Sequence, residues 1–261
     1  TGPVITLKGE AVVTHEAGGS YTDAGASATD VVDGDLSGEV EVVSTVNVSR
    51  PGSYTMSYGV SDGAGNNAKA IVRKVNVVDT TGPVVTLKGE AVVTHEAGSG
   101  YTDAGASAED VVDGDLSGSI KVEGGVDVSK PGVYELSYGV KDTQGNVGTE
   151  VVRKVNVVDT TGPVITLKGE AVVTHEAGGS YTDAGASATD VVDGVVSVQT
   201  SGHVNQNKPG SYTLIYNAID AAGNKSTNTR TVKVQDTTGP EIKLKGEALA
   251  THEAGSSYKD S

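Results

Sequence analysis

The strongest constraint on the fold of this 261-residue chain is an internal repeat. The segment Thr1–Glu10 returns almost unchanged at Thr81 and Thr161, and more loosely at Thr238. The first two periods are 80 residues and the third is 77, with the shortening after Gly194 and again in the last expected strand. A fixed period of this length indicates one structural unit per repeat. We therefore expect three complete repeats and an incomplete fourth, with the boundaries 1–79, 80–159, 160–236 and 237–261.

Inside one repeat, apolar residues alternate with small polar ones. The alternation is clearest in Tyr54–Ser61, where a period of two indicates a strand with one buried face. Turn residues such as Asp33-Gly34 separate this strand from the other candidates. Those candidates are Val4–Leu7, Val12–His15, Ala24–Ala28, Val40–Val43 and Ile71–Val78. About seven short strands per repeat, with no helical period, predict an all-β fold of tandem immunoglobulin-like β-sandwiches forming an elongated rod.

The composition supports small cores and excludes several classes of protein. Phe, Trp and Cys are absent and the ten Tyr are the only aromatic residues, so each core must be built from aliphatic side chains and Tyr. Without Cys there is no disulfide, thiolate metal site or Cys nucleophile. A net charge of −15 argues against nucleic acid as a partner, and no apolar run is long enough for membrane insertion. Because the chain opens inside a linker, at Thr1-Gly2-Pro3, we expect a piece of a longer protein.

Several motifs of each repeat resemble a known family. They are Pro-x-Ile-x-Leu-x-Gly from Pro3, Tyr21–Ala26, Asp33–Leu36, Pro51-Gly52-x-Tyr54-x-x-x-Tyr58 and Asp62-x-x-Gly65-Asn66. In this order they resemble the bacterial Ig-like repeats first named from pesticidal crystal proteins, and they are similar to hyalin-type repeats. The resemblance implies tandem Ig-like modules of the kind found in large adhesins and other surface proteins. Such modules occur in adhesins, surface-layer proteins, secreted enzymes and toxins alike, so the resemblance leaves the function open.

An acidic loop in each repeat is the best candidate for chemistry. In the first repeat, Asp30, Asp33 and Asp35 lie within six residues around a turn glycine. Carboxylate oxygens around a sharp turn suit Ca²⁺, which prefers hard oxygen ligands. The alternative is a plain turn in which Asp30 caps its own backbone. The third repeat departs from this pattern, because Val195 stands where the first two repeats have Asp35 and Asp115.

The Ig topology brings further carboxylates to this loop. The chain enters such a sandwich beside the acidic loop and the loop after the Tyr-rich strand, so Asp79 should arrive beside both loops of the next repeat. The turn at His15-Glu16 is expected to reach the same junction. Because converging carboxylates repel, a bound dication would hold the linker in place. We predict structural Ca²⁺ with ligands from Asp30, Asp33, Asp35 and Asp62 in the first repeat; Asp79, Asp110, Asp113, Asp115, Asp142 and Asn146 at the first junction; and Asp159, Asp190, Asp193, Asp220 and Asn224 at the second.

The sequence makes four further predictions about this site and its neighbours. With Val195 in place of an Asp, the second junction should bind Ca²⁺ more weakly than the first. Each repeat also has one His beside a Glu, such as His15, which is too few ligands for zinc and indicates a His packed in a loop. The Tyr54 element resembles the tyrosine corner of Ig sandwiches, and Asp23 is predicted to cap a turn.

The sequence favours a structural role over catalysis. It contains no nucleophile elbow with a Ser-His-Asp set, no phosphate loop and no carboxylate pair in an aromatic cleft. We expect a non-enzymatic spacer in a secreted or cell-surface bacterial protein, adhesin-like, whose partners are the neighbouring repeats and, through domains outside this chain, a host or cell-surface receptor. The alternatives are a ligand-binding module for a glycan or protein receptor, and a surface-layer or filament-forming repeat. Variation between Glu39–Asn47 and Ser119–Asp127 and at scattered exposed positions indicates drift, not a preserved pocket.

The final segment, Thr238–Ser261, carries only the opening strands of a repeat. These strands are expected at Glu241–Leu244 and Ala248–His252. Two strands cannot bury enough apolar area to offset their chain entropy. We therefore expect them to lie unpaired with a bare apolar face, as in a cut from a longer array; the alternative is packing into a neighbouring chain.

Overall fold

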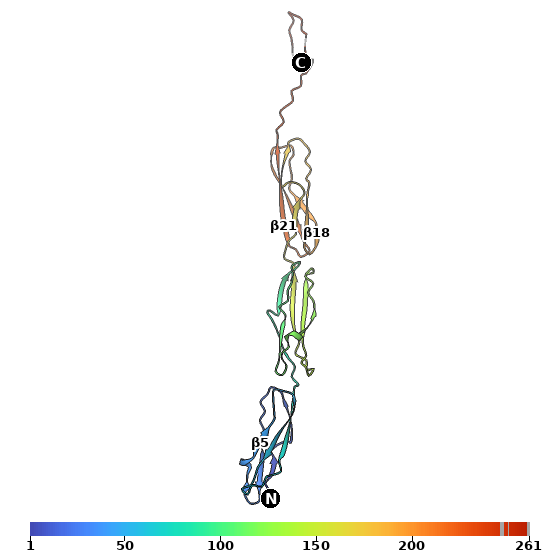
Figure 1. Cartoon of the computed structure of the whole chain (residues 1–261). Helices are drawn as coiled ribbons and strands as arrows, with labels where there is room; N and C mark the ends of the chain where they lie inside the picture. The colour runs from blue at the N-terminus through green and yellow to red at the C-terminus, as the bar shows by residue number, and fades with distance from the viewer. Residues whose placement is uncertain (246–247, 250, 260–261) are drawn as a thin grey trace. The chain divides into compact units, whose positions relative to one another are not determined.

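The computed structural model describes residues 1–245, 248–249 and 251–259 (Figure 1). The fold is nearly all β, with 46% strand and 2% helix, which confirms the predicted fold class of tandem Ig-like sandwiches. The chain divides into two compact units, Thr1–Val158 and Asp159–Ser261. The first unit contains two repeats, and the second contains the third repeat and the segment after it. Among the described residues, no helix is long and apolar enough to cross a membrane.

The first repeat is a sandwich of two sheets. One sheet has the order β1-β3-β4, from β1 (Val4–Leu7), β3 (Ala26–Asp30) and β4 (Gly34–Asp35). The other has the order β2-β7-β6-β5, from β2 (Val12–Glu16), β5 (Glu41–Ser44), β6 (Gly52–Gly59) and β7 (Ile71–Val78). Only the β2–β7 pair is parallel in this repeat. A single 3-10 turn, η1 (Ser37–Glu39), connects the two sheets.

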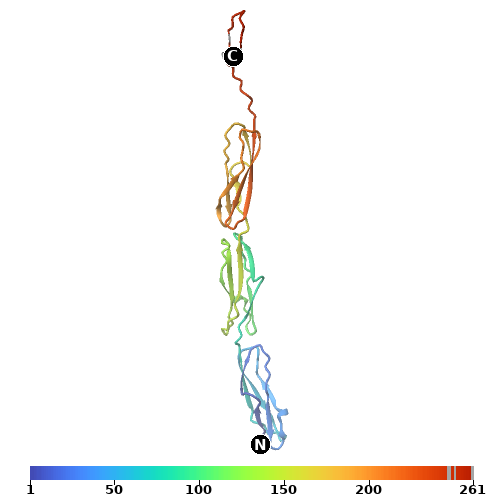
Figure 2. The ribbon, with the colours of Figure 1, turned by 180° about the vertical axis from the view of Figure 1, so that it is seen from behind.

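The second repeat copies this architecture strand by strand. Its sheets are β8 (Val84–Leu87), β10 (Ala106–Asp110) and β11 (Gly114–Asp115), and β9 (Val92–Glu96), β12 (Lys121–Gly124), β13 (Gly132–Gly139) and β14 (Val151–Val158), with η2 (Ser117–Ser119) between them. In the first two repeats, as Figures 1 and 2 show, the chain enters the sandwich at one pole and leaves at the opposite pole. This path places the residue after the last strand of a repeat at the pole far from that repeat's own acidic loop.

The third repeat differs in the hairpin formed by the two central strands of its larger sheet. Its sheets are β15 (Val164–Leu167), β17 (Ala186–Asp190) and β18 (Gly194–Val196), and β16 (Val172–Glu176), β19 (Val198–Ser201), β20 (Gly210–Ile219) and β21 (Lys225–Gln235). The β20–β21 hairpin pairs without a break from Gly210 to Ile219. In the first repeat the corresponding hairpin is interrupted and resumes as the isolated bridge Ser61↔Asn67. The shorter third period thus removes the irregular part of this hairpin.

Each core is small and built from the residues that alternation predicts. In the first repeat Tyr58 and Val75 are fully buried, with Ile5, Ala28 and Val77 packed in the same cluster. Tyr54 donates its hydroxyl to the carbonyl of Arg50 at 2.8 Å, so the predicted tyrosine corner is present. The His of each repeat packs in its loop, as predicted: His15 contacts Tyr21 edge to face at 5.3 Å and hydrogen-bonds the Gly19 carbonyl at 3.2 Å.

One predicted strand is misplaced and another is absent. The strand expected at Ala24–Ala28 begins at Ala26, because the Asp23 carboxylate accepts the Gly25 amide at 2.8 Å and holds the chain in a turn there. Gly25 has φ +79°, a conformation that a strand residue does not adopt. The segment Glu241–Leu244 is not a strand either, and Ile242 and Leu244 are 90% and 73% exposed. In the first repeat the equivalent segment pairs with β3, whereas the described residues form no strand beside Glu241–Leu244.

The other strand expected near the C-terminal end falls partly outside the described residues. Ala248–His252 includes position 250, which the structure does not describe, and its described residues are not in a strand. Leu249 is 85% exposed. A local contact of the complete repeats nevertheless recurs here, since His252 and Tyr258 lie edge to face with their ring centres 5.5 Å apart.

Candidate metal centres

In the part of the chain that the structure describes, aspartates gather in three sets, which we call the first, second and third carboxylate groups. In each group three Asp side chains offer one oxygen apiece within 4.8 Å of one another. The groups are Asp30, Asp33 and Asp62; Asp79, Asp113 and Asp142; and Asp159, Asp193 and Asp220. The second and third groups each include the Asp that follows, in sequence, the last strand of a repeat.

Two loops of each repeat position these carboxylates. In the second repeat, Asp110 accepts the amides of Val112 and Asp113 at 2.8 and 2.9 Å, and this closes the turn after β10. Asp113 then reaches across to the loop after β13, where its carboxylate accepts the Thr143 amide at 2.9 Å. The third repeat repeats this link, since Asp193 accepts the Ala221 amide at 2.7 Å. In both repeats a carboxylate of the acidic loop, Asp113 or Asp193, therefore holds the second loop by a hydrogen bond.

The second loop holds its buried carboxylate with an asparagine. Asp142 is only 8% exposed and accepts the Asn146 amide at 2.8 Å and the Asn146 side-chain nitrogen at 2.7 Å. Burial raises the pKa of Asp142, but these hydrogen bonds more than offset it and lower the pKa overall. Asn146 also donates to the Asp79 carbonyl at 3.1 Å. In the third repeat, Asn224 donates to the Asp159 carbonyl at 3.1 Å.

Of the three aspartates in the second group, Asp79 accepts the fewest hydrogen bonds from the described residues. Its Oδ2 is buried, and no described residue donates a hydrogen bond to it. Its Oδ1 accepts only the Thr81 amide, at 3.4 Å. Burial raises the pKa of Asp79, and the negative charges of Asp110, Asp142 and Glu16 raise it further. A buried carboxylate oxygen without a donor is unfavourable, and one physical explanation for such an atom is a bound cation.

Some of the predicted ligands lie outside the three groups. Asp35 and Asp115 accept the amides of Ser37 and Ser117 at 2.9 and 2.8 Å, and neither joins a carboxylate group. Asp110 and Asp190 cap their own turns, as Asp30 does, although Asp30 also belongs to the first group. Asn146 and Asn224 present their nitrogens, not their oxygens, to the linker carbonyls. The second and third groups therefore contain equal numbers of carboxylates, although Val195 replaces an Asp.

The linker after the first repeat is also held from the repeat that precedes it. Glu16, at the end of β2, accepts the backbone amide and the hydroxyl of Thr80, both at 2.8 Å, and the Thr81 hydroxyl at 2.8 Å. These hydrogen bonds lower the pKa of Glu16. Glu176 makes the same contacts to Thr237 and Thr238. The sequence predicts that the His15-Glu16 turn reaches the junction, and in the structure the Glu16 side chain makes this contact.

Apolar contacts complete the junction inside the first unit. Val112 of the second repeat packs against the core cluster of the first repeat. Its neighbour Val111 covers Gly18 so closely that an added Cβ would lie 2.1 Å from a Val111 methyl carbon. Gly18 has φ +79°, so both its conformation and this contact require glycine. The equivalent Val31 and Val32 of the first repeat are 93% and 89% exposed.

Each repeat also has a buried arginine that was not predicted from the sequence. Arg73 is 1% exposed and bonds the Asp23 carboxylate and the Lys8 carbonyl, with its Nε donating to the Glu10 carbonyl at 2.9 Å. The equivalents are Arg153 with Asp103 and Arg230 with Asp183. The burial of Arg73 could have been predicted, because Arg73 lies on the same face of its strand as the buried Val75 and Val77. Asp23 caps its turn as predicted, but it is also the partner of this arginine.

The second carboxylate group suits a hard dication. Its donors are oxygens only, which favours Ca²⁺, Mg²⁺ or Mn²⁺ over zinc or copper. A cation there would meet the buried Asp79 oxygen and the carboxylates of Asp113 and Asp142. The fit therefore rests on the unsatisfied oxygen as well as on the number of carboxylates.

Comparison with known proteins identifies the repeats. The family model described as "Bacterial surface protein, Ig-like domain" matches residues 5–77, 85–157 and 165–234. An uncharacterized 81.3 kDa protein of Acholeplasma phage L2 is 30% identical over 79% of this chain and 30% of its own length. Pesticidal crystal protein Cry22Aa of Bacillus thuringiensis is 27% identical, over 79% of this chain and 29% of its own length. Hyalin of Strongylocentrotus purpuratus is 29% identical, over 98% of this chain and 23% of its own length.

These relatives confirm the resemblance to pesticidal-crystal-protein and hyalin repeats. The chain spans less than a third of the length of each of the three. Among solved structures, human CDH23 EC21-23 aligns with 79% of this chain at 16% identity and a TM-score of 0.34; it spans 80% of that chain, and so distant a likeness carries no functional information. The matched family is one of surface Ig-like domains and not of enzymes. With three matches that together cover most of the chain, this protein belongs to the family of Ig-like domains of bacterial surface proteins.

Proposed function

We propose that the three repeats form a structural spacer in a secreted or surface-displayed, adhesin-like bacterial protein, and that Ca²⁺ at the second and third carboxylate groups fixes each linker to the repeat after it. The observation that carries the calcium proposal is the buried Asp79 Oδ2, which receives no hydrogen bond from the described residues. A folded chain does not bury such an oxygen without cost. Asp113 and Asp142 lie beside it and add charge of the same sign.

Calcium has a specific task in this proposal. When bound, it supplies the positive charge that Asp79, Asp113 and Asp142 lack. The protein's own residues do the rest: Asn146 holds the Asp79 carbonyl, and Asp113 ties the two loops together. The linker residue Asp79 is thereby attached to the second repeat through its backbone and through its side chain.

A spacer also needs contacts that do not depend on a metal. Glu16 fixes Thr80 and Thr81 to the first repeat, and Val112 packs on the core of the first repeat. The linker is therefore attached to the preceding repeat by hydrogen bonds and to the following repeat by the carboxylate group. With one such junction per period, the reach of the spacer increases with the number of repeats.

Calorimetry with and without a chelator tests the proposal. A ligand that binds only the folded state stabilises it by about 2.7 kcal/mol at 100-fold excess over its Kd. We expect Ca²⁺ to raise the melting temperature of the full chain and the chelator to lower it again, with β content unchanged. Asp79→Asn should remove part of this response, whereas the matched control Asp35→Asn should keep all of it. Melting curves that ignore both calcium and chelator would contradict the proposal.

A further inference from the structure

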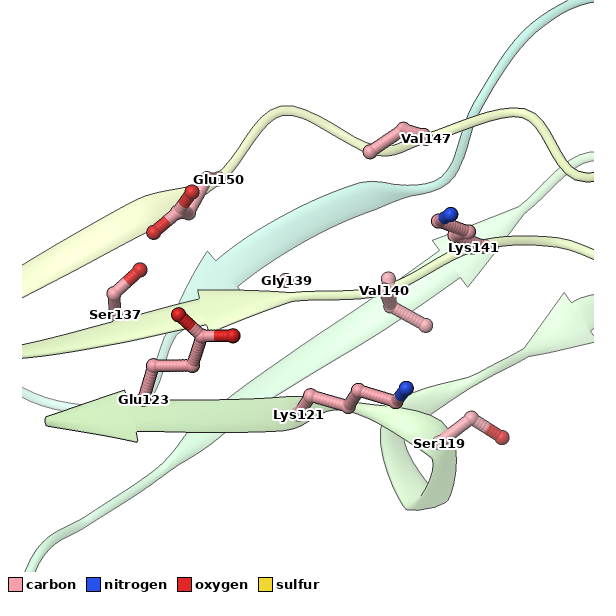
Figure 3. A pocket seen from close by; sticks show the side chains of 9 residues that line it. All are labelled: Ser119, Lys121, Glu123, Ser137, Gly139, Val140, Lys141, Val147 and Glu150. Atoms are coloured by element: carbon pink, nitrogen blue, oxygen red, sulfur yellow. The ribbon is translucent and has the colours of Figure 1, made fainter.

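The second repeat has a surface groove with a floor of two small residues, and the fold does not require the glycine among them. The groove has a volume of about 310 Å³ and lies on the outward face of β12 and β13 (Figure 3). Ser137 and Gly139 form its floor, since they alternate with the buried Leu136 and Tyr138 along β13. Gly139 does not have a positive φ, and a Cβ added to it would meet nothing within 4 Å.

Gly139 is the last residue of β13, where neither its backbone conformation nor a neighbouring atom requires glycine. A glycine in a strand often marks a place where a ligand or another backbone approaches closely. The third repeat shows that side chains are tolerated here. Its equivalents of Ser137 and Gly139, which flank the buried Tyr216 as those residues flank Tyr138, are Ile215 and Asn217. The two floor positions therefore carry small residues in the second repeat and larger ones in the third.

The walls of the groove carry charges of opposite sign at its two ends. Glu123 on β12 and Glu150 before β14 flank Ser137 from either side, and Lys121 and Lys141 lie farther along, as Figure 3 shows. Glu123 is paired with Ser137 and Lys121 with Gly139 in the sheet, so the order along the groove is fixed by register. No ion pair joins any of these four side chains to another described residue.

The first repeat has the same floor and different walls. Ser57 and Gly59 occupy the floor positions, and a Cβ on Gly59 would likewise meet nothing within 4 Å. All four charges change between the two repeats: Glu41, Val43, Ser61 and Ala70 stand where the second repeat has Lys121, Glu123, Lys141 and Glu150. Several of the differences that indicate drift in the sequence thus fall on one surface. The first repeat keeps an open floor without the basic end.

We propose that this groove of the second repeat binds an extended peptide segment that carries a cationic and an anionic side chain on one face. The acidic end would take the cation and the basic end the anion. In an extended chain, side chains two residues apart share a face and lie about 7 Å from each other. This spacing equals one step of two residues along β13, such as that from Ser137 to Gly139. The lining has no aromatic ring on which a sugar could stack, which favours a peptide over a glycan.

Nuclear magnetic resonance titration of the labelled full chain tests this proposal. The probes are three blocked pentapeptides: Thr-Lys-Thr-Glu-Thr and its counterparts with two Lys or two Glu. We expect only the mixed-charge peptide to shift the amides of Lys121–Gly124 and Ser137–Lys141, and the shifts to weaken as salt is added. No shifts, equal shifts from all three peptides, or shifts produced instead by a neutral or acidic oligosaccharide would overturn the proposal.

Matched variants separate binding from folding. Gly139→Asn installs the residue that the third repeat carries at this position, so the fold should tolerate it while the filled floor abolishes binding. The control Gly59→Asn makes the same change in the first repeat and should leave binding intact. Lys141→Ser and Glu150→Thr remove one charge from each end, and each should weaken binding at least about ten-fold, a loss of about 1.4 kcal/mol. Lys141→Arg should retain it; undiminished binding by Gly139→Asn would refute the site.

Discussion

Two aspartates of the first repeat, Asp23 and Asp79, are both partly buried, but the residues around them differ. The Asp23 carboxylate is bonded by Arg73 and accepts the Tyr58 hydroxyl at 2.7 Å and the Gly25 amide at 2.8 Å. Burial raises the pKa of Asp23, but the hydrogen bonds from Tyr58 and Arg73 outweigh it and lower the pKa. Asp79 forms no ion pair with a cationic side chain among the described residues, and burial together with neighbouring carboxylates raises its pKa.

The chain itself provides the positive charge beside Asp23, whereas we propose that the positive charge beside Asp79 comes from solution. Asp23 has its positive charge built into the core, so the sandwich does not need a metal to bury it. Asp79 meets carboxylates instead, at the point where one repeat joins the next. The stability that the Arg73–Asp23 pair contributes should therefore be the same with and without calcium, whereas the attachment of the linker, and the stability that comes with it, should depend on calcium.

The largest expected effect is on the core pair. Arg73→Met leaves Asp23 and the carbonyls of Lys8 and Glu10 without their donor. Breaking a buried pair on one side costs about 3–5 kcal/mol, and the loss should be the same in calcium and in chelator. Urea denaturation measures it. The control Arg50→Met, at an exposed arginine of the same repeat, should change the free energy of unfolding by less than about 0.5 kcal/mol. If calcium restored the stability that Arg73→Met loses, the proposed distinction between Asp23 and Asp79 would be wrong.

The pH dependence of stability sharpens the comparison, since the two carboxylates act with opposite sign. The lowered pKa of Asp23 means that its contribution is present above the ordinary value of about 4 and is lost as pH falls through the folded value. The raised pKa of Asp79 means that the folded state holds that proton more tightly, so ionisation costs stability as pH rises from about 4 through the folded value.

Denaturation in chelator over the acid range checks both signs. The stability of the wild type relative to Asp79→Asn should fall as pH rises, and its stability relative to Asp23→Asn should increase. Asp35→Asn serves as a comparison of known sign, because hydrogen bonds from Ser37 lower the pKa of Asp35 and its difference curve should therefore run in the same direction as that of Asp23→Asn. Two difference curves of the same sign would show that the environments of Asp23 and Asp79 do not differ as described.

A smaller effect is expected at the glutamate that holds the linker. Glu16→Gln replaces a carboxylate that accepts the Thr80 amide and two threonine hydroxyls. The Thr80 amide should then exchange with solvent several-fold faster, in calcium and in chelator alike, because this contact involves no metal. Hydrogen exchange by nuclear magnetic resonance measures it, with the exposed Glu10→Gln as control. Unchanged exchange would mean that the Glu16 contact does not protect the linker.

The smallest expected effect concerns Asp115. The sequence ranks the first junction as the tighter calcium site because the third repeat has Val195 at the equivalent position. In the structure the Asp115 carboxylate accepts the Ser117 amide at 2.8 Å and stands apart from the second group. Asp115→Val should therefore leave calcium affinity nearly unchanged in a titration of the full chain. A clear loss of affinity would return Asp115 to the set of ligands.

Much of the fold could be predicted because the sequence repeats it three times. Alternation along Tyr54–Ser61 and Ile71–Val78 identifies two central strands and their buried faces. The start of β3 was misplaced because the Asp23 carboxylate, which fixes the turn at Gly25, draws its other partners from Tyr58 and Arg73, far along the chain. Contacts of that kind are not visible in local pattern.

The candidate site could be predicted only in part. Chain topology alone predicts that Asp79 lies beside the loops that hold Asp113 and Asp142, because Asp79 directly follows the last strand of the first repeat. Topology was not enough to distinguish these residues from Asp110 and Asp115, only a few positions away. Short hydrogen bonds to local amides decide which carboxylates turn back on their own loop, and the sequence pattern of acidic residues does not reveal them.

Calcium titration of the full chain and of Asp79→Asn, both freed of metal with chelator and dialysed, tests the central claim most directly. Isothermal calorimetry of the wild type should show binding at the second and third carboxylate groups. The Asp79→Asn chain should lose one of these binding events and keep the other, since Asp159, Asp193 and Asp220 remain intact. Identical isotherms for the two chains, or no heat from either, would contradict the claim that Asp79 completes a calcium site.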